Sequence, residues 1–176
     1  VWLAWDRYAD TVYVYDCYRQ SSQTPVVHSA AIRERGKWIP VVWPHDGSQH
    51  DKGSGHSLAD IYRKQGLNMM HTHFTNPKGD IAIEPGIMEM LQRMETGRFK
   101  VFSYLKDWYE EVRMYHRKDG RIVASNDDLM SATRYAVQSL KFATTGKPVH
   151  RKRKAVGSGP GEWNYFPVER KQRIYA

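Results

Sequence analysis

Cysteine is nearly missing from this chain of 176 residues, which contains only Cys17. A single cysteine excludes an intrachain disulfide framework and a zinc finger built on cysteines, and it suits a reducing compartment. The sequence also lacks any hydrophobic run near the roughly 20 residues that a membrane-spanning helix needs. No phosphate-binding loop of the Gly-x4-Gly-Lys-Ser/Thr type occurs. The sequence therefore predicts neither a membrane protein nor a nucleotide-driven motor.

Acidic residues are outnumbered, because 27 Lys and Arg face 19 Asp and Glu, which gives a net charge of +8. The imbalance is concentrated at one end. Nine cations and two anions follow Leu140, so this segment carries +7 and the first 140 residues carry +1. We interpret 1–140 as the folded core and 141–176 as a basic, Gly-rich extension. The charge makes a polyanion a candidate partner, and a solvated tail without a dedicated role is the alternative interpretation of the extension.

Local patterns along the core predict an α/β fold with a mixed sheet. Two aromatic, β-branched runs at 2–5 and 11–18 flank a polar turn and predict a hairpin. Further strands are predicted over 38–43, 67–74 and 99–102, and a turn is predicted at Asp119-Gly120. Helices are predicted over 25–35, 57–65, 84–96 and 105–114, and from Leu129 to Leu140.

The first candidate site residue is Asp46, in the segment Trp43-Pro44-His45-Asp46-Gly47. It follows directly after the apolar run at 38–43, which we interpret as a strand buried on both faces. An acid just beyond such a strand lies at the carboxyl edge of the sheet, where open α/β sheets place their ligand sites. Any polar residue in this loop can instead be exposed to solvent without a functional role. This alternative is weakest for Asp46, because of its position after the apolar run.

The second candidate is the pair Asp127 and Asp128, at the predicted start of the last helix. Asn126 or Asp127 is expected to cap that helix, since an acidic side chain there accepts hydrogen bonds from free amides. One aspartate is enough for capping, so a second adjacent carboxylate favours a cation nearby. Oxygen ligands from separate elements suit Mg²⁺ or Mn²⁺.

With these residues in hand, the chain resembles the C-terminal nuclease domain of a large terminase subunit from a tailed bacteriophage of the headful-packaging type. The resemblance rests on the order of the elements and on two motifs. The first is Pro-His-Asp-Gly at 44–47, which follows the aromatic hairpin and a helix. The second is Asn-Asp-Asp-Leu-Met-x-Ala-x-Arg-Tyr-Ala at 126–136. Their combination in this order is more specific than either motif alone.

The resemblance implies a ribonuclease H-like mixed sheet flanked by helices, and an endonuclease that cuts concatemeric viral DNA with two metal ions, Mg²⁺ or Mn²⁺. Asp46 and Asp128 would be catalytic metal ligands, with Asp127 as an auxiliary or alternative acid. The basic cluster Arg151, Lys152, Arg153 and Lys154 would contact double-stranded DNA. A portal protein and a small terminase subunit are the implied partners, in the host bacterial cytoplasm at the procapsid during assembly.

One part of the family pattern is missing from this sequence. The family's first acid lies on a strand that precedes the aromatic hairpin, whereas this chain begins inside that hairpin at Val1. We therefore expect the chain by itself to lack one central strand and one metal-binding acid. Two other functions stay open at this stage. The domain is alternatively a catalytically silent DNA-binding or docking remnant of a prophage terminase, or another ribonuclease H-like nuclease such as a resolvase.

Overall fold

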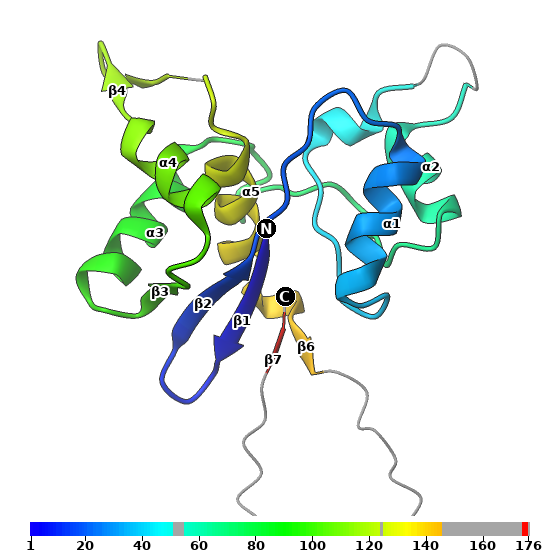
Figure 1. The fold of residues 1–176 in the computed structure, drawn as a ribbon. Helices are drawn as coiled ribbons and strands as arrows, with labels where there is room; N and C mark the ends of the chain where they lie inside the picture. Colours follow the sequence, from blue (N-terminus) through cyan, green and yellow to red (C-terminus); the bar gives the residue numbers. More distant parts are fainter. Residues whose placement is uncertain (51–54, 124, 146–173, 176) are drawn as a thin grey trace, which may run out of the picture.

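A computed structural model describes residues 1–50, 55–123, 125–145 and 174–175 (Figure 1). The larger of its two sheets has the strand order β3-β2-β1-β7-β6. Its strands are β1 (Trp2–Asp6), β2 (Thr11–Asp16), β3 (Phe99–Val101), β6 (Thr144–Thr145) and β7 (Ile174–Tyr175). The helices are α1 (Pro25–Arg35), α2 (Leu58–Lys64), α3 (Glu84–Glu95), α4 (Lys106–Met114) and α5 (Asp128–Val137), with the short 3-10 helices η1 (His45–Ser48) and η2 (Leu140–Phe142). None of the described helices combines the length and the hydrophobicity needed to span a bilayer.

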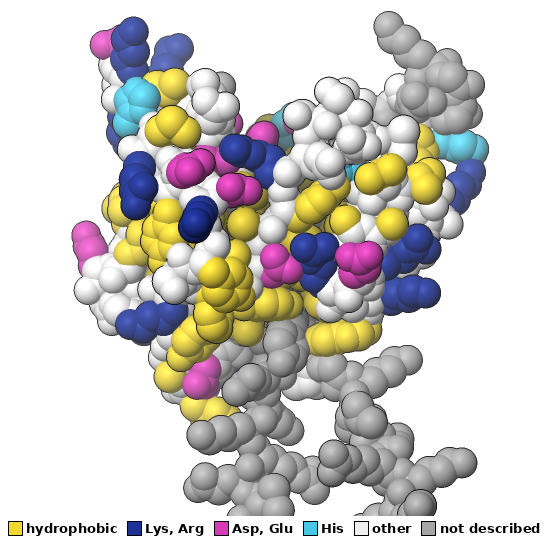
Figure 2. Space-filling model, viewed as in Figure 1, with side chains coloured by type: hydrophobic (Ala, Val, Ile, Leu, Met, Phe, Trp, Pro, Cys, Tyr) yellow, Lys and Arg dark blue, Asp and Glu magenta, His cyan; other side chains and the backbone are white. Residues whose placement is uncertain are grey.

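The predicted aromatic hairpin is present as the antiparallel pair β1 and β2. Its turn is held by the carboxylate of Asp6, which accepts hydrogen bonds from the amides of Tyr8 and Ala9. The inward side chains Leu3, Val12 and Val14 are completely buried. Strand β3 extends the sheet parallel to β2, which confirms the strand predicted at 99–102. Hydrophobic side chains accordingly gather over this part of the molecule, while charged ones are scattered around it (Figure 2).

Three helices, α3, α4 and α5, lie together on one side of the sheet (Figure 1). Their inward residues pack on the hairpin to form the main core, together with residues of β3, η2 and the segment before α4. The residues added to the hairpin are Met90, Phe99, Leu105, Trp108, Leu129, Met130, Val137 and Leu140. The predicted apolar stripe is therefore confirmed at Leu129 and Val137 of α5, while Leu140 is buried in η2, beyond the end of the helix. The burial of this stripe fixes the orientation of α5, because only one face of the helix is apolar enough to pack on the sheet.

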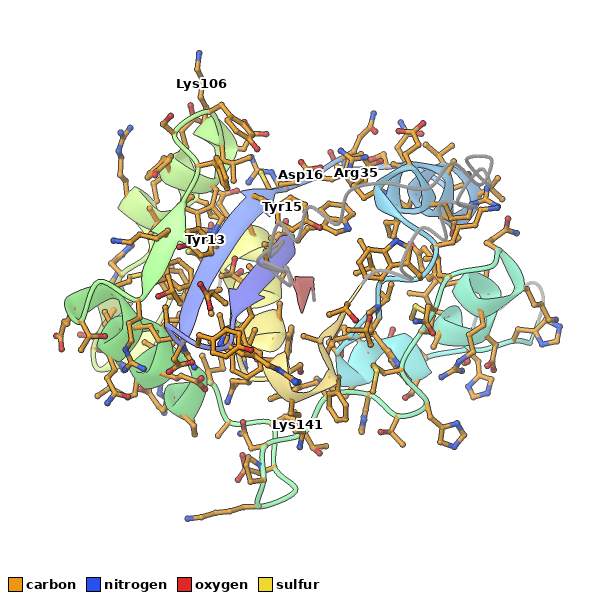
Figure 3. All side chains as sticks on the ribbon, turned by 90° about the horizontal axis from the view of Figure 1, so that it is seen from below. Tyr13, Tyr15, Asp16, Arg35, Lys106 and Lys141 are labelled. Carbon is orange, nitrogen blue, oxygen red and sulfur yellow. The ribbon has the colours of Figure 1, made fainter. Side chains whose placement is uncertain are left out.

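Helices α1 and α2 form a second group on the other side of the hairpin (Figure 1). The predicted start of α1 is confirmed, since Thr24 caps the helix and Pro25 occupies its first turn. Arg35 joins this group to the sheet. Its Nε lies 2.8 Å from the carboxylate of Asp16, and its guanidinium lies 4.8 Å from the ring centre of Trp2. Figure 3 shows the side chains of Asp16 and Arg35 directed toward one another.

The strands predicted at 38–43 and 67–74 are reduced to one parallel bridge between Val41 and Met69. The amide of Val41 donates to Asn68, and that of Met70 donates to Val41. Pro40 and Pro44 bracket the bridge and cannot donate, which limits its length. Among the described residues, neither segment pairs with the larger sheet. The prediction of burial on both faces is also wrong, because Val41 and Val42 are only half-buried.

The outer edge of β1 is only partly paired. Strand β7 pairs with Ala4 and Trp5, and β6 pairs with β7. Within the described parts of the chain, no strand pairs with Trp2 and Leu3 on this edge. The bridge between Val41 and Met69 lies across from it, so a gap in strand pairing separates the hairpin from the segment that leads to Asp46.

A second, two-stranded sheet is formed by β4 (Arg117–Lys118) and β5 (Arg121–Ile122). Its two-residue turn consists of Asp119 and Gly120, whose φ angles are 50° and 76°. Positive φ at both central positions gives the tight turn that matches the twist of a hairpin. The predicted turn is therefore confirmed.

Candidate active site

A groove of about 480 Å³ lies between the start of β1, the segment before η1, and α5. Its walls are mostly apolar and include Trp2, Ile32, Ile39, Val42, Tyr135 and Phe142. Among the described residues, the charged side chains that line this groove are those of Asp46 and Asp128. Two acids on an otherwise apolar groove mark one place where the described part of the chain can hold a cation.

Asp46 reaches the groove from η1, which follows the bridged segment at Val41. The buried ring of Trp43 supports this turn, because its indole N–H donates to the carbonyl of Met70 at 2.8 Å. Gly47 packs on the same ring, and a Cβ at this position would lie 2.5 Å from a ring carbon. The glycine therefore lets η1 lie against Trp43 with Asp46 exposed. The imidazole Nε2 of His45 lies 2.8 Å from the Asp46 carboxylate.

Asp128 lines the same groove from a different element, as the first residue of α5. Asn126 makes the turn into the helix with a φ of 52°. The neighbouring Asp127 is not among the residues that line the groove, and its carboxylate accepts a hydrogen bond from the hydroxyl of Ser131 at 3.2 Å. The structure therefore brings Asp46 and Asp128 to one groove and leaves Asp127 beside it.

The expected capping residue of α5 is confirmed in position as Asp127, but the expected hydrogen bonds from its side chain to free amides are absent. The carboxylate of Glu111, on α4, instead accepts a hydrogen bond from the amide of Met130 at 2.6 Å. Its second oxygen pairs with the guanidinium of Arg19 at 3.0 Å. Burial raises the pKa of Glu111, although the hydrogen bonds from the first turn of α5 and the charge of Arg19 oppose that shift.

Sequence analysis did not identify Glu111. A usable signal was nonetheless present, because Glu111 lies three residues after Trp108 on the same amphipathic helix. Residues three apart share one face of a helix, so a carboxylate there is directed into the core with the tryptophan. A buried acid needs partners, and its position therefore predicts a polar network.

The chain is similar to known proteins in both sequence and fold. The family model of the terminase RNase H-like domain matches residues 1–140. The large terminase subunit of Salmonella phage P22 is 40% identical over 150 residues, and that of Enterobacteria phage LP7 is 43% identical over 134 residues. The structure of the P22 large terminase nuclease domain matches with a TM-score of 0.72 and 42% identity, over 80% of this chain and 73% of that chain. The chain belongs to the terminase RNase H-like domain family.

The matches cover unequal shares of the proteins compared. The alignments include 85% and 76% of this chain, but only 30% and 28% of the large terminase subunits of P22 and LP7. The resemblance inferred from the two motifs is confirmed, as is the ribonuclease H-like fold class. Membership in the terminase family also favours a terminase over a resolvase, which was one of the alternatives from the sequence.

The residues present fit a hard divalent cation in type but are too few for two ions. Carboxylate oxygens from separate elements are suitable ligands for Mg²⁺ or Mn²⁺, and Asp46 and Asp128 line one groove. Within the described residues, no group of three or more His, Cys, Asp or Glu side chains is arranged to hold a metal. The basic cluster at 151–154 lies outside the described residues.

Proposed function

We propose that this terminase domain is a metal-dependent endonuclease that cleaves concatemeric viral DNA during genome packaging. One observation carries the proposal. Asp46 and Asp128 are far apart in sequence, yet they are the charged side chains that line one apolar groove in the described structure. The similarity to a large terminase subunit and to its nuclease domain supports this proposal.

Asp46 and Asp128 would be the metal ligands, and Asp127 would act as an auxiliary acid next to them. When bound, two Mg²⁺ or Mn²⁺ ions would activate the attacking water and stabilise the leaving oxygen. The walls of the groove around the two acids are mostly apolar. The carboxylates of Asp46 and Asp128 would hold the cations in the groove.

A third acid is needed to complete a two-ion centre. We propose that an acid-bearing strand, encoded before the hairpin in a longer protein, supplies it. The partly paired edge of β1 and the groove beside Trp2 support this proposal, because an extended segment placed there would pair with β1.

The expected partners follow from the same function. Double-stranded DNA would be the substrate, and the basic cluster at 151–154 would contribute phosphate contacts. A portal protein and a small terminase subunit would be the assembly partners. The proposed place of action is the host bacterial cytoplasm, at the procapsid during assembly.

A catalytically silent DNA-binding or docking domain is the second candidate function. It is favoured by the observation that the described residues include no group of three metal-binding side chains. The two functions differ in whether a longer protein with the preceding strand cuts DNA. A silent domain would bind DNA without cleaving it under any metal condition.

Plasmid cleavage tests the proposal. A longer version of the chain with the preceding strand should nick or linearise plasmid DNA with Mn²⁺ or Mg²⁺, and EDTA should stop the reaction. Asp46→Asn should abolish cleavage without unfolding the domain, because it removes a charged ligand and keeps the side-chain volume. Asp107→Asn, which changes an exposed acid on α4, is the matched control and should cut normally. Full activity of Asp46→Asn would place the metal site elsewhere.

A further inference from the structure

Glu111 is the most completely buried acidic residue among those described, with no exposed surface on its side chain. A carboxylate in such a position is unfavourable unless hydrogen bonds or an opposite charge compensate it. The side chain does not face the groove, and neither of its oxygens is free. Its role therefore depends on the groups with which it pairs.

The partners of Glu111 come from two segments that are distant in sequence. One oxygen accepts a hydrogen bond from the amide of Met130, which is a buried residue in the first turn of α5. The other oxygen pairs with Arg19, which follows β2 and is partly exposed. Glu111 thus connects the end of the hairpin to the helix whose first residue is Asp128.

Helices α4 and α5 share a second contact, which lies farther along α5 from Asp128 than the contact of Glu111 with Met130. The indole N–H of Trp108 donates to the hydroxyl of Thr133 at 3.0 Å, and that hydroxyl donates to the carbonyl of Leu129 at 2.6 Å. This contact holds the middle of α5, whereas Glu111 holds its first turn. Because the side chain of Asp127 makes no capping hydrogen bond, the first turn depends on a partner from outside the helix.

We propose that Glu111 and Arg19 form a positioning pair, which fixes the first turn of α5 and thereby aims the carboxylate of Asp128 into the groove. This inference rests on the proposed function, in which Asp128 binds metal. Glu111 is a positioning residue rather than a ligand, since both of its oxygens are engaged by the protein. Groups that orient metal ligands in this way typically change metal affinity or activity by about 10- to 100-fold when they are mutated.

Hydrogen exchange on the 176-residue chain tests the structural half of the proposal. Glu111→Gln keeps the size of the side chain but removes its charge and the ion pair with Arg19. We expect faster amide exchange over 128–132 in this variant and in Arg19→Gln, which changes a partly exposed side chain and leaves the buried core intact. Glu110→Gln, the exposed neighbour on the same helix, is the matched control and should exchange at the rate of the unmodified chain. Unchanged exchange in both Glu111→Gln and Arg19→Gln would overturn the proposal.

Direct Mn²⁺ binding tests the functional half. In the longer protein with the preceding strand, we expect Glu111→Gln and Arg19→Gln each to weaken Mn²⁺ binding by about tenfold or more. The double variant should lose no more than either single variant, because one pair is broken in each case. If amide exchange is faster in these variants but Mn²⁺ affinity is unchanged, Glu111 only stabilises the start of α5, and its positioning role is overturned. Failure of the unmodified longer protein to bind Mn²⁺ would instead refute the proposed function, and the positioning role for Asp128 with it.

Discussion

Gly47 determines how closely the turn that carries Asp46 approaches the core. The buried ring of Trp43 occupies the space into which any Cβ at position 47 would project, at 2.5 Å. That ring is itself held by its hydrogen bond to Met70, so it has little freedom to move. The position of Asp46 thus depends on the absence of one methyl group next to it.

Gly47→Ala should therefore destabilise the domain and displace Asp46. Forcing a methyl group into a packed site typically costs about 1–3 kcal/mol. Urea denaturation should show a lower midpoint, and the longer protein should lose cleavage activity. Ser48→Ala, at the exposed neighbouring position, should leave both measurements unchanged. An unaltered midpoint for Gly47→Ala would show that the ring of Trp43 can move aside.

Asp10, in the turn between β1 and β2, joins the hairpin to α3 and β3. Its carboxylate accepts hydrogen bonds from the indole of Trp5 at 3.0 Å and from Arg93 at 3.1 Å, and it pairs with Arg98. Partial burial by itself would raise the pKa of Asp10. The hydrogen bonds from Trp5 and Arg93 and the charges of the two arginines outweigh burial, and the pKa lies below its usual value.

The contribution of Asp10 to stability should therefore be lost in acid. A carboxyl group with a lower pKa in the folded state stabilises the fold above its unfolded pKa, which is about 3.9, and this gain disappears as the pH falls through the folded value. Asp10→Asn should lower the free energy of unfolding at pH 7 by about 1 kcal/mol, since the site is partly exposed. The difference should shrink at pH 3. Urea denaturation at both pH values checks this, with Asp107→Asn as the control; an equal difference at both would contradict the assignment.

Elements with local signals could be predicted from the sequence, and those that depend on distant neighbours could not. Thr24 with Pro25 and Asp119 with Gly120 fix a helix start and a tight turn through the backbone of a few residues. The apolar run at 38–43 predicts a strand equally clearly. Whether it pairs depends on the segment beside it, and a groove, not a strand, lies next to it in the described structure. Glu111 was missed for the same reason, because its partner in α5 is 19 residues away.

The candidate site shows the same division at a larger scale. Asp46 and Asp128 could each be identified from their positions at the end of an apolar run and at the start of a helix. That they line the same groove depends on the packing of α5 against the hairpin, which the sequence pattern does not specify. Motif order supplied that information indirectly, through the resemblance to terminase nuclease domains that the comparisons confirm.

Charge is divided unequally over the whole chain, since seven of the eight net positive charges follow Leu140. The core is close to neutral, and several of its arginines are held in ion pairs, such as those of Arg35 with Asp16 and Arg117 with Glu84. A paired arginine has less charge to offer to a phosphate. Affinity for DNA should therefore depend on the C-terminal extension more than on the core.

Replacing Arg151, Lys152, Arg153 and Lys154 by Gln should weaken DNA binding and flatten its dependence on salt. Each phosphate contact on duplex DNA releases condensed counterions and contributes about −0.9 to the slope of log K against log salt concentration. Four lost contacts would reduce the magnitude of the slope by at most about 4, with little change in sequence preference, because phosphate contacts position a protein without reading bases. Binding isotherms at several salt concentrations measure the slope, and Lys100→Gln with Lys106→Gln, two exposed cations of the core, is the control. If the slope falls for the control and stays constant for the cluster, the core binds the DNA and the extension is only solvated.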